Sequence, residues 1–178
     1  MRIFIALEIP PLMQDELAGM VRPLRASMPG RFIPRENWHV TLAFLGDAPE
    51  ALLPDVEDVL DTAARGIGGI TLASDRLGKF GRSADASFWL GLADDPCLTA
   101  LATRLREELR EREIDFDDRP FLPHITLARR ARIPKGELPP LPFPVPAQAT
   151  RVAVFKSTLS REGATYEEVY GIDLEPAR

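Results

Sequence analysis

The chain has 178 residues, enough for one compact domain with a sizeable core. Its 22 Lys and Arg against 27 Asp and Glu give a net charge of −5, which excludes a protein that wraps long stretches of nucleic acid. One cysteine excludes an internal disulfide and favours a reducing, cytoplasmic location. The first apolar run ends at Glu8, so we expect neither a signal peptide nor a membrane-spanning segment.

Apolar periodicity in the first half of the chain predicts alternating strands and helices. A near-continuous apolar run is typical of a buried strand, and apolar residues three or four positions apart are typical of a helix that covers a core. The predicted elements are a strand at 2–8, a helix after Pro10–Pro11 whose last turn Pro23 distorts, a strand at 38–45, a helix from Pro49 or Pro54 to Arg65, and a strand at 70–74.

The second half continues the same pattern. Asp95 before Pro96 is a typical helix start, and the helix that follows places its leucines on one face. The other predicted elements are strands at 87–92 and 124–128, an extended proline-rich connection at 134–146, and a closing pair of strands at 152–159 and 165–174. Strands in pairs around three helices indicate an α+β fold.

One short motif occurs twice. The sequence HVTLA at 39–43 returns as HITLA at 124–128, and these two segments hold both histidines of the protein. Side chains alternate across a strand, so each His and the Thr two residues later point to one face, while the apolar residues point to the other. If the repeat reflects two similar lobes, the two His/Thr pairs can face each other across a cleft.

Such a pair of strands suits phosphate chemistry. Two imidazoles on opposite sides of a phosphate can act as general base and general acid near neutral pH without a metal. The hydroxyls of Thr41 and Thr126 can donate to the phosphate oxygens. Nucleophilic catalysis by these hydroxyls is disfavoured because no third group orients the histidine. Two histidines and one cysteine also exclude the common zinc frameworks, so we predict no metal and no cofactor.

These segments resemble the two-histidine (HxTx) phosphoesterase superfamily, and specifically the bacterial and archaeal RNA 2′,3′-cyclic phosphodiesterases, also called 2′-5′ RNA ligases. The resemblance covers nearly the full length; its segments are RIFIALEIP at 2–10, ENWHVTLAFLG at 36–46, KFGR at 79–82, RPFLPHITLAR at 119–129 and KSTLSREGATYEEVY at 156–170. It implies a single bilobed domain over 1–178, with two pseudo-symmetric lobes around a central cleft. Each lobe is then an antiparallel sheet with helices outside.

The resemblance also implies a reaction and its residues. It implies hydrolysis of a terminal 2′,3′-cyclic phosphate on RNA or a nucleotide to a 2′-phosphate, with His39 as the proton donor and His124 as the proton acceptor. It places Arg129 near the substrate phosphate. Counted along an unbroken strand, Arg129 points away from the cleft, so the strand must bend or bulge to bring it in. No protein partner and no membrane are implied.

Alternatives remain at this stage. The same site could ligate RNA by the reverse reaction, or the fold could be a non-catalytic nucleotide-binding module; a metallohydrolase is disfavoured by the short supply of ligands. Three aromatic residues near the motifs could stack a base, but for each of them we favour packing in the core, as we do for Trp38 and Trp89. The three are Phe44, Phe80 and Phe121.

Overall fold

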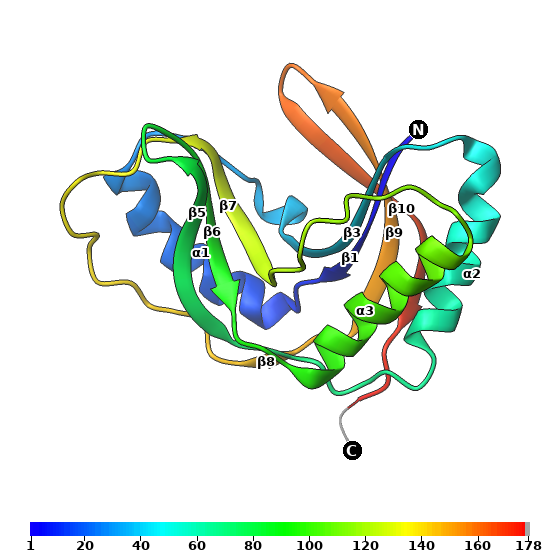
Figure 1. Cartoon of the computed structure of the whole chain (residues 1–178). Helices are drawn as coiled ribbons and strands as arrows, with labels where there is room; N and C mark the ends of the chain where they lie inside the picture. Colours follow the sequence, from blue (N-terminus) through cyan, green and yellow to red (C-terminus); the bar gives the residue numbers. More distant parts are fainter. Residues whose placement is uncertain (177–178) are drawn as a thin grey trace.

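Two four-stranded antiparallel sheets, with helices outside them, form the framework of the protein (Figure 1). The structure is a computed structural model that describes residues 1–176. One sheet has the strand order β10-β9-β1-β3 and the other β2-β7-β6-β5, and a short pair, β4-β8, lies apart. The α+β prediction is confirmed.

The chain passes between the two sheets more than once. The strands are β1 (Arg2–Glu8), β2 (Arg31–Phe32), β3 (His39–Asp47), β4 (Thr71–Leu72), β5 (Ser74–Arg82), β6 (Asp85–Leu92), β7 (His124–Ala131), β8 (Ala147–Gln148), β9 (Arg151–Ser160) and β10 (Gly163–Asp173). The helices are α1 (Pro11–Ser27), α2 (Leu53–Ala64) and α3 (Pro96–Glu111), with short 3₁₀ turns η1 (Arg35–Asn37) and η2 (Glu50–Leu52).

Helix α3 begins at Pro96, directly after Asp95, as the sequence predicted. The Asp95 carboxylate accepts hydrogen bonds from the backbone N–H groups of Cys97 and Leu98, which have no partner inside the helix. Helix α1 runs through Pro23 and ends at Ser27. Its apolar face, from Met13 to Leu24, is buried as the spacing predicted.

The prediction of one strand at 70–74 was wrong in its extent. Only Thr71–Leu72 pairs there, with β8, and a separate strand, β5, begins at Ser74. No apolar pattern marks β5, because its segment, SDRLGKFGR, is polar, contains two glycines and forms an edge of its sheet. An edge strand with one exposed face lacks the apolar run that is typical of a buried strand.

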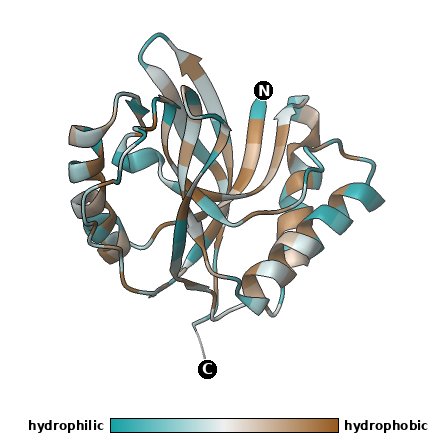
Figure 2. Cartoon of the chain, turned by 60° about the vertical axis from the view of Figure 1, so that its left-hand side comes forward, coloured by the Kyte–Doolittle hydropathy of each residue, from teal (hydrophilic) through white to brown (hydrophobic). Residues whose placement is uncertain are grey.

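The chain crosses repeatedly between the sheets instead of completing one before starting the other. Strand β1 belongs to the first sheet, but α1 follows it and lies on the outer side of the second sheet (Figures 1 and 2). Helices α2 and α3 pack against one another and against β9 and β3 of the first sheet. The last two strands, β9 and β10, return to that sheet. Each sheet is therefore built from both halves of the sequence.

One continuous hydrophobic core joins these layers. It contains the inward side chains of both sheets and of all three helices, whose apolar faces turn toward the sheets (Figure 2). Within the described residues, no helix combines the length and the apolar character that crossing a membrane requires. The residues from 132 to 146 form no helix or strand, as predicted for the proline-rich connection.

Candidate active site

The two histidines begin matching strands that lie next to each other where the sheets meet. His39 is the first residue of β3 and His124 is the first residue of β7, and these strands are in contact. In both strands the His and the Thr are half-buried while the residue after each is fully buried. The alternation predicted for the two motifs is thus present in the fold.

Each imidazole is held in the same way. The Nδ1 atom of His39 lies 2.7 Å from the carbonyl oxygen of Asn37, and Nδ1 of His124 lies 2.6 Å from the carbonyl oxygen of Leu122. A carbonyl only accepts, so each Nδ1 carries the hydrogen and donates it. In the neutral ring Nε2 is then the acceptor nitrogen. In both rings, Nε2 is therefore the nitrogen that can accept or release a proton in a reaction.

The surroundings of the two Nε2 atoms differ. Nε2 of His39 lies 2.9 Å from the hydroxyl oxygen of Thr41, whereas Nε2 of His124 has no hydrogen-bond partner among the residues that the structure describes. In the neutral state the Thr41 hydroxyl donates to His39. The His124 lone pair stays open to an approaching proton donor such as water.

Burial lowers the pKa of both imidazoles. The pKa of His39 falls from its ordinary value of 6.5 to about 4, mainly through desolvation, with smaller contributions from the positive charge of Arg129 and from His124. The pKa of His124 is also lowered, again mainly by burial and then by Arg129. The positive charge of Arg129 thus lowers the pKa of both rings, and His124 is close enough to His39 to lower its pKa further.

A β-bulge sits at the same position of both motifs. On β3, Thr41 and Ala43 pair with consecutive residues of β1, so Leu42 is the extra residue; on β7, Thr126 and Ala128 pair with consecutive residues of β6. Both residues of each Leu-Ala pair are buried as a result. Alternation then resumes one residue later than in a regular strand.

The bulge decides where Arg129 lies. Because Ala128 turns inward, Arg129 is exposed on the side of the histidines, and its charge lowers the pKa values of both. A second irregularity follows immediately, where Arg130 adopts a left-handed backbone with φ of 49°. Together with Phe80, these arginines line a pocket of about 450 Å³. The bend that the sequence required is present.

Phe44 is the counterpart of Arg129 in the other motif, since both follow the bulged Leu-Ala pair. Its ring is half-buried and the guanidinium of Arg2 lies over it, 4.9 Å from the ring centroid. Phe121 is also half-buried, packs on the core and lies 5.8 Å from the Arg106 guanidinium. Phe121 packs on the core as predicted, and Phe44 lies outside that core cluster.

The prediction that Phe80 packs in the core was wrong. Phe80 is 47% exposed because it stands on edge strand β5, on the side of His124, whose ring it meets edge-on at 5.3 Å. Trp38 and Trp89 are buried as predicted, with 6% and 4% exposure. The ring of Trp89 lies 5.7 Å from that of His124.

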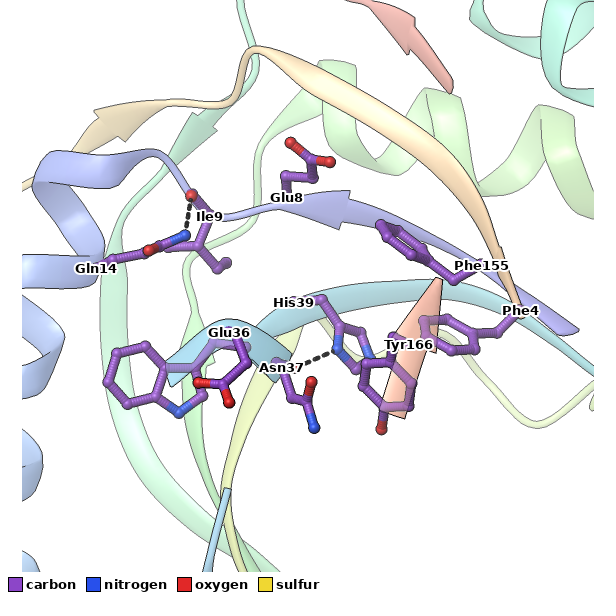
Figure 3. A pocket seen from close by; sticks show the side chains of 10 residues that line it. Phe4, Glu8, Ile9, Gln14, Glu36, Asn37, His39, Phe155 and Tyr166 are labelled. Carbon is purple, nitrogen blue, oxygen red and sulfur yellow. Dashed lines mark hydrogen bonds between the residues drawn. The ribbon is translucent and has the colours of Figure 1, made fainter. Parts of the chain in front are cut away.

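The contacts around His39 include residues that the sequence did not single out. Tyr166 of β10 meets the His39 ring edge-on at 5.4 Å, and Phe4 of β1 lies 4.9 Å from it (Figure 3). The side-chain amide of Asn37 donates to the carbonyl of Ala164 at 2.8 Å, which ties the turn before His39 to the β9–β10 hairpin. Tyr166 is far from His39 in the chain, so only the fold brings the two together.

Potential metal ligands do not gather near the histidines. Across residues 1–176 the structure contains no cluster of three or more His, Cys, Asp or Glu side chains placed to hold an ion. Asp117, one of the acidic residues in the turn before the second motif, pairs with Arg119, which keeps the pKa of its carboxyl low.

Two antiparallel sheets thus bring the matching His and Thr residues of the two motifs together. Comparison with known proteins gives the family. The chain matches the model of the 2′-5′ RNA ligase superfamily over residues 13–158 and belongs to that superfamily.

Known relatives cover almost the whole chain. An RNA 2′,3′-cyclic phosphodiesterase of Thermus thermophilus is 33% identical, and the match covers 93% of this chain and 86% of the relative. A crystal structure of a Thermus thermophilus protein superposes with a TM-score of 0.85 at 27% identity over 100% of both chains. Escherichia coli LigT, crystallised with 3′-AMP, superposes with a TM-score of 0.76 at 29% identity over 97% of both chains.

Proposed function

We propose that the protein is a metal-independent RNA 2′,3′-cyclic phosphodiesterase, which opens the cyclic phosphate at the end of an RNA or a nucleotide to leave a 2′-phosphate. The observation that carries this proposal is the matched pair of imidazoles, each held through Nδ1 by a backbone carbonyl and both within the field of Arg129. The Thermus thermophilus relative that is 33% identical to this chain carries that activity in its name and supports the proposal.

In the reaction we propose, the oxygen of a water molecule attacks phosphorus while His124 accepts a proton from that water. The bond between phosphorus and the 3′-oxygen breaks, and His39 gives its proton to that oxygen. Displacement in line requires the two rings on opposite sides of phosphorus, which two facing strands can provide and one strand cannot. Thr41, Thr126 and Arg129 bind the phosphate oxygens, on which negative charge increases in the transition state.

The contacts of the two imidazole rings indicate which histidine is the acid and which is the base. The open lone pair on Nε2 of His124 favours this ring as the base, since a proton acceptor must be free to take the proton. His39, which has the more strongly lowered pKa, needs the negative charge of the bound phosphate to hold its proton. The acid is therefore formed in the complex with substrate, and both rings are neutral in the free protein at neutral pH.

Chelation tests the metal-independent mechanism. We expect the purified protein to hydrolyse 2′,3′-cyclic AMP to 2′-AMP at an unchanged rate after exhaustive treatment with EDTA, because imidazoles and not a bound cation move the protons. The product is identified by chromatography against 2′-AMP and 3′-AMP standards. Loss of activity in EDTA that zinc or manganese restores would refute this mechanism.

The dependence of the rate on pH tests the lowered pKa values. The reaction needs one protonated and one neutral ring, so the profile is bell-shaped and its limbs belong to the pair. In the free protein both pKa values lie below 6.5, so we expect the profile of kcat/KM to fall away on the alkaline side already below neutrality. In the complex the phosphate anion raises both pKa values, so the profile of kcat is displaced to higher pH.

Steady-state rates between about pH 4 and pH 9 give both profiles. The cyclic phosphate stays anionic over this range, so the limbs report on the protein. An alkaline limb of kcat/KM above neutrality, or profiles of kcat and kcat/KM that coincide, would contradict the burial of the imidazoles.

The ligation of a cyclic phosphate to a 5′-hydroxyl uses the same groups, with the hydroxyl in place of water. Water is present at far higher concentration, so we propose hydrolysis as the net reaction. We also propose that residues 1–178 act as a single bilobed domain in the cytoplasm, the compartment that the single cysteine favours. A non-catalytic binding module would not need the open lone pair on Nε2 of His124.

A further inference from the structure

The pocket beside His124 extends past the groups that act on the cyclic phosphate. It has a volume of about 450 Å³ and is lined by residues of β2, β5, β6 and β7. Phe80, in its wall, meets the His124 ring edge-on at 5.3 Å, and Arg129, also in its wall, lowers the pKa of both histidines. The pocket therefore adjoins the reacting phosphate and also reaches Arg31 and Arg130.

Three arginines of this pocket have no acidic partner. Arg31, Arg129 and Arg130 are exposed and make no ion pair or side-chain hydrogen bond with any residue that the structure describes. Asp85 is the one acidic residue among the described residues that line the pocket, and it pairs with none of the three. Several arginines elsewhere do pair with carboxylates, namely Arg35, Arg112, Arg119 and Arg151. In a chain of net charge −5, this cluster of unneutralised positive charge indicates a site for an anion.

The strand pairing brings two of these charges together. Arg31 of β2 and Arg129 of β7 are directly opposite one another in the antiparallel register. Side chains of directly opposite residues lie on the same face of a sheet, and like charges in such a pair destabilise it. An anion bound between the two guanidinium groups would replace this repulsion with attraction.

An irregularity of β7 adds the third charge. Between two regular pairs of β6 and β7, Arg129 and Arg130 together stand opposite a single residue, Ser87. In a regular strand, two consecutive side chains point to opposite faces. Here both line one pocket, and Arg130 has a left-handed backbone with φ of 49°, which is uncommon for residues other than glycine. Backbone conformations of this kind cost free energy and gather at functional sites.

The substrate of the proposed reaction carries a second anion that suits this pocket. In RNA that ends in a cyclic phosphate, the nearest other phosphate is the one on the 5′-oxygen of the same ribose. A cyclic mononucleotide with a free 5′-hydroxyl has no such group. Arginine binds phosphate oxygens through its planar fork of N–H donors, and the hydroxyl of Ser87, in the same wall, can donate as well.

We propose that Arg31 and Arg130 form a subsite for the phosphate on the 5′-oxygen of the terminal nucleoside, so that the protein acts on RNA ends in preference to cyclic mononucleotides. The subsite rests on the proposed function, because its ligand is part of the substrate of that reaction. A 5′-phosphate monoester and an internucleotide phosphodiester offer the same kind of anionic oxygens, and the choice of substrates distinguishes these two sources.

Three substrates that differ only at the 5′-oxygen test the subsite. They are 2′,3′-cyclic AMP with a free 5′-hydroxyl, the same nucleotide with a 5′-phosphate, and the dinucleotide in which a second adenosine is attached through that phosphate. We expect kcat/KM to be about tenfold higher for both phosphorylated substrates, the usual size of one charge-assisted contact. A gain for the dinucleotide alone would show that the protein recognises the neighbouring nucleoside and not the phosphate, and would contradict the proposal.

Two variants test the residues. Arg31→Gln and Arg130→Asn each remove one charge, and asparagine tolerates the left-handed backbone of residue 130. We expect each variant to lower the ratio of kcat/KM with a 5′-phosphate to kcat/KM without it, and the double variant to bring this ratio close to one. Arg132→Gln is the matched control, because Arg132 is exposed and makes no ion pair within residues 1–176 but does not line the pocket. It should leave the ratio as in the native protein.

Ionic strength gives a measurement that needs no variant. The Debye length falls from roughly 30 Å at 0.01 M to roughly 10 Å at 0.1 M salt, so the preference for a 5′-phosphate should shrink over this range. Equal kcat/KM for the three substrates at low salt would overturn the subsite while leaving the proposed function intact. So would a preference that survives in the double variant, or one that Arg132→Gln lowers as much as the other single changes. Absence of hydrolysis for every substrate would instead refute the function.

Discussion

Alanine at either histidine should reduce kcat for the hydrolysis of 2′,3′-cyclic AMP by roughly 10²–10⁴, the usual contribution of one positioned acid or base. His39→Ala removes the group that protonates the 3′-oxygen, and His124→Ala removes the group that accepts the proton of water. Each change also removes one hydrogen bond to a backbone carbonyl. Circular dichroism and thermal unfolding of the variants separate loss of chemistry from loss of fold.

The double variant gives the sharper test. Two groups that act on one transition state do not contribute independently, so removing both should cost little more than removing one. Losses that multiply would show that the rings act in separate steps. Near-normal turnover in one single variant would exclude that residue from catalysis.

A substrate with a better leaving group should distinguish the acid from the base. Sulfur in place of the 3′-bridging oxygen leaves as a thiolate and needs no proton, so we expect this substrate to restore most of the activity lost in His39→Ala. It should not restore His124→Ala, because water must still lose its proton. Initial rates of both variants with the oxygen and sulfur substrates, relative to the native protein, measure the effect.

The reverse pattern would exchange the two roles. The pKa values of the free protein would agree with such an exchange. The pKa of His39 is the more strongly lowered, so His124 holds a proton more readily. Rescue of neither variant would indicate that both rings mainly bind the phosphate.

The sequence predicted the parts of the site that lie within a few residues of one another. His39, Thr41 and their counterparts at 124 and 126 share a strand face by simple alternation, and the fold brings the two strands together. Asp95 and the apolar spacing after it were enough to predict α3. These signals are local, because backbone geometry alone determines which neighbours share a face.

The remainder depended on contacts between distant segments. Alternation alone placed Arg129 on the wrong face, and only pairing with β6 reveals the bulge that turns it toward the histidines. Tyr166 reaches His39 through the position of β10 in its sheet, which no pattern near residue 166 encodes. Phe80 looked like a core residue because exposure on an edge strand leaves no mark in the sequence.

The alternating path of the chain has a mechanical consequence. Strand β1 is held between β3 and β9, one from each end of the sequence, and the proline-rich connection at 134–146 is the only covalent link to β9 and β10 from the preceding chain. After a protease nick there, only pairing with β1 and packing on the core hold β9 and β10, and loss of that fragment would remove Tyr166 and Phe155 from the surroundings of His39. Both histidines lie before the connection, but the sheet that positions His39 is complete only when β9 and β10 pair with β1.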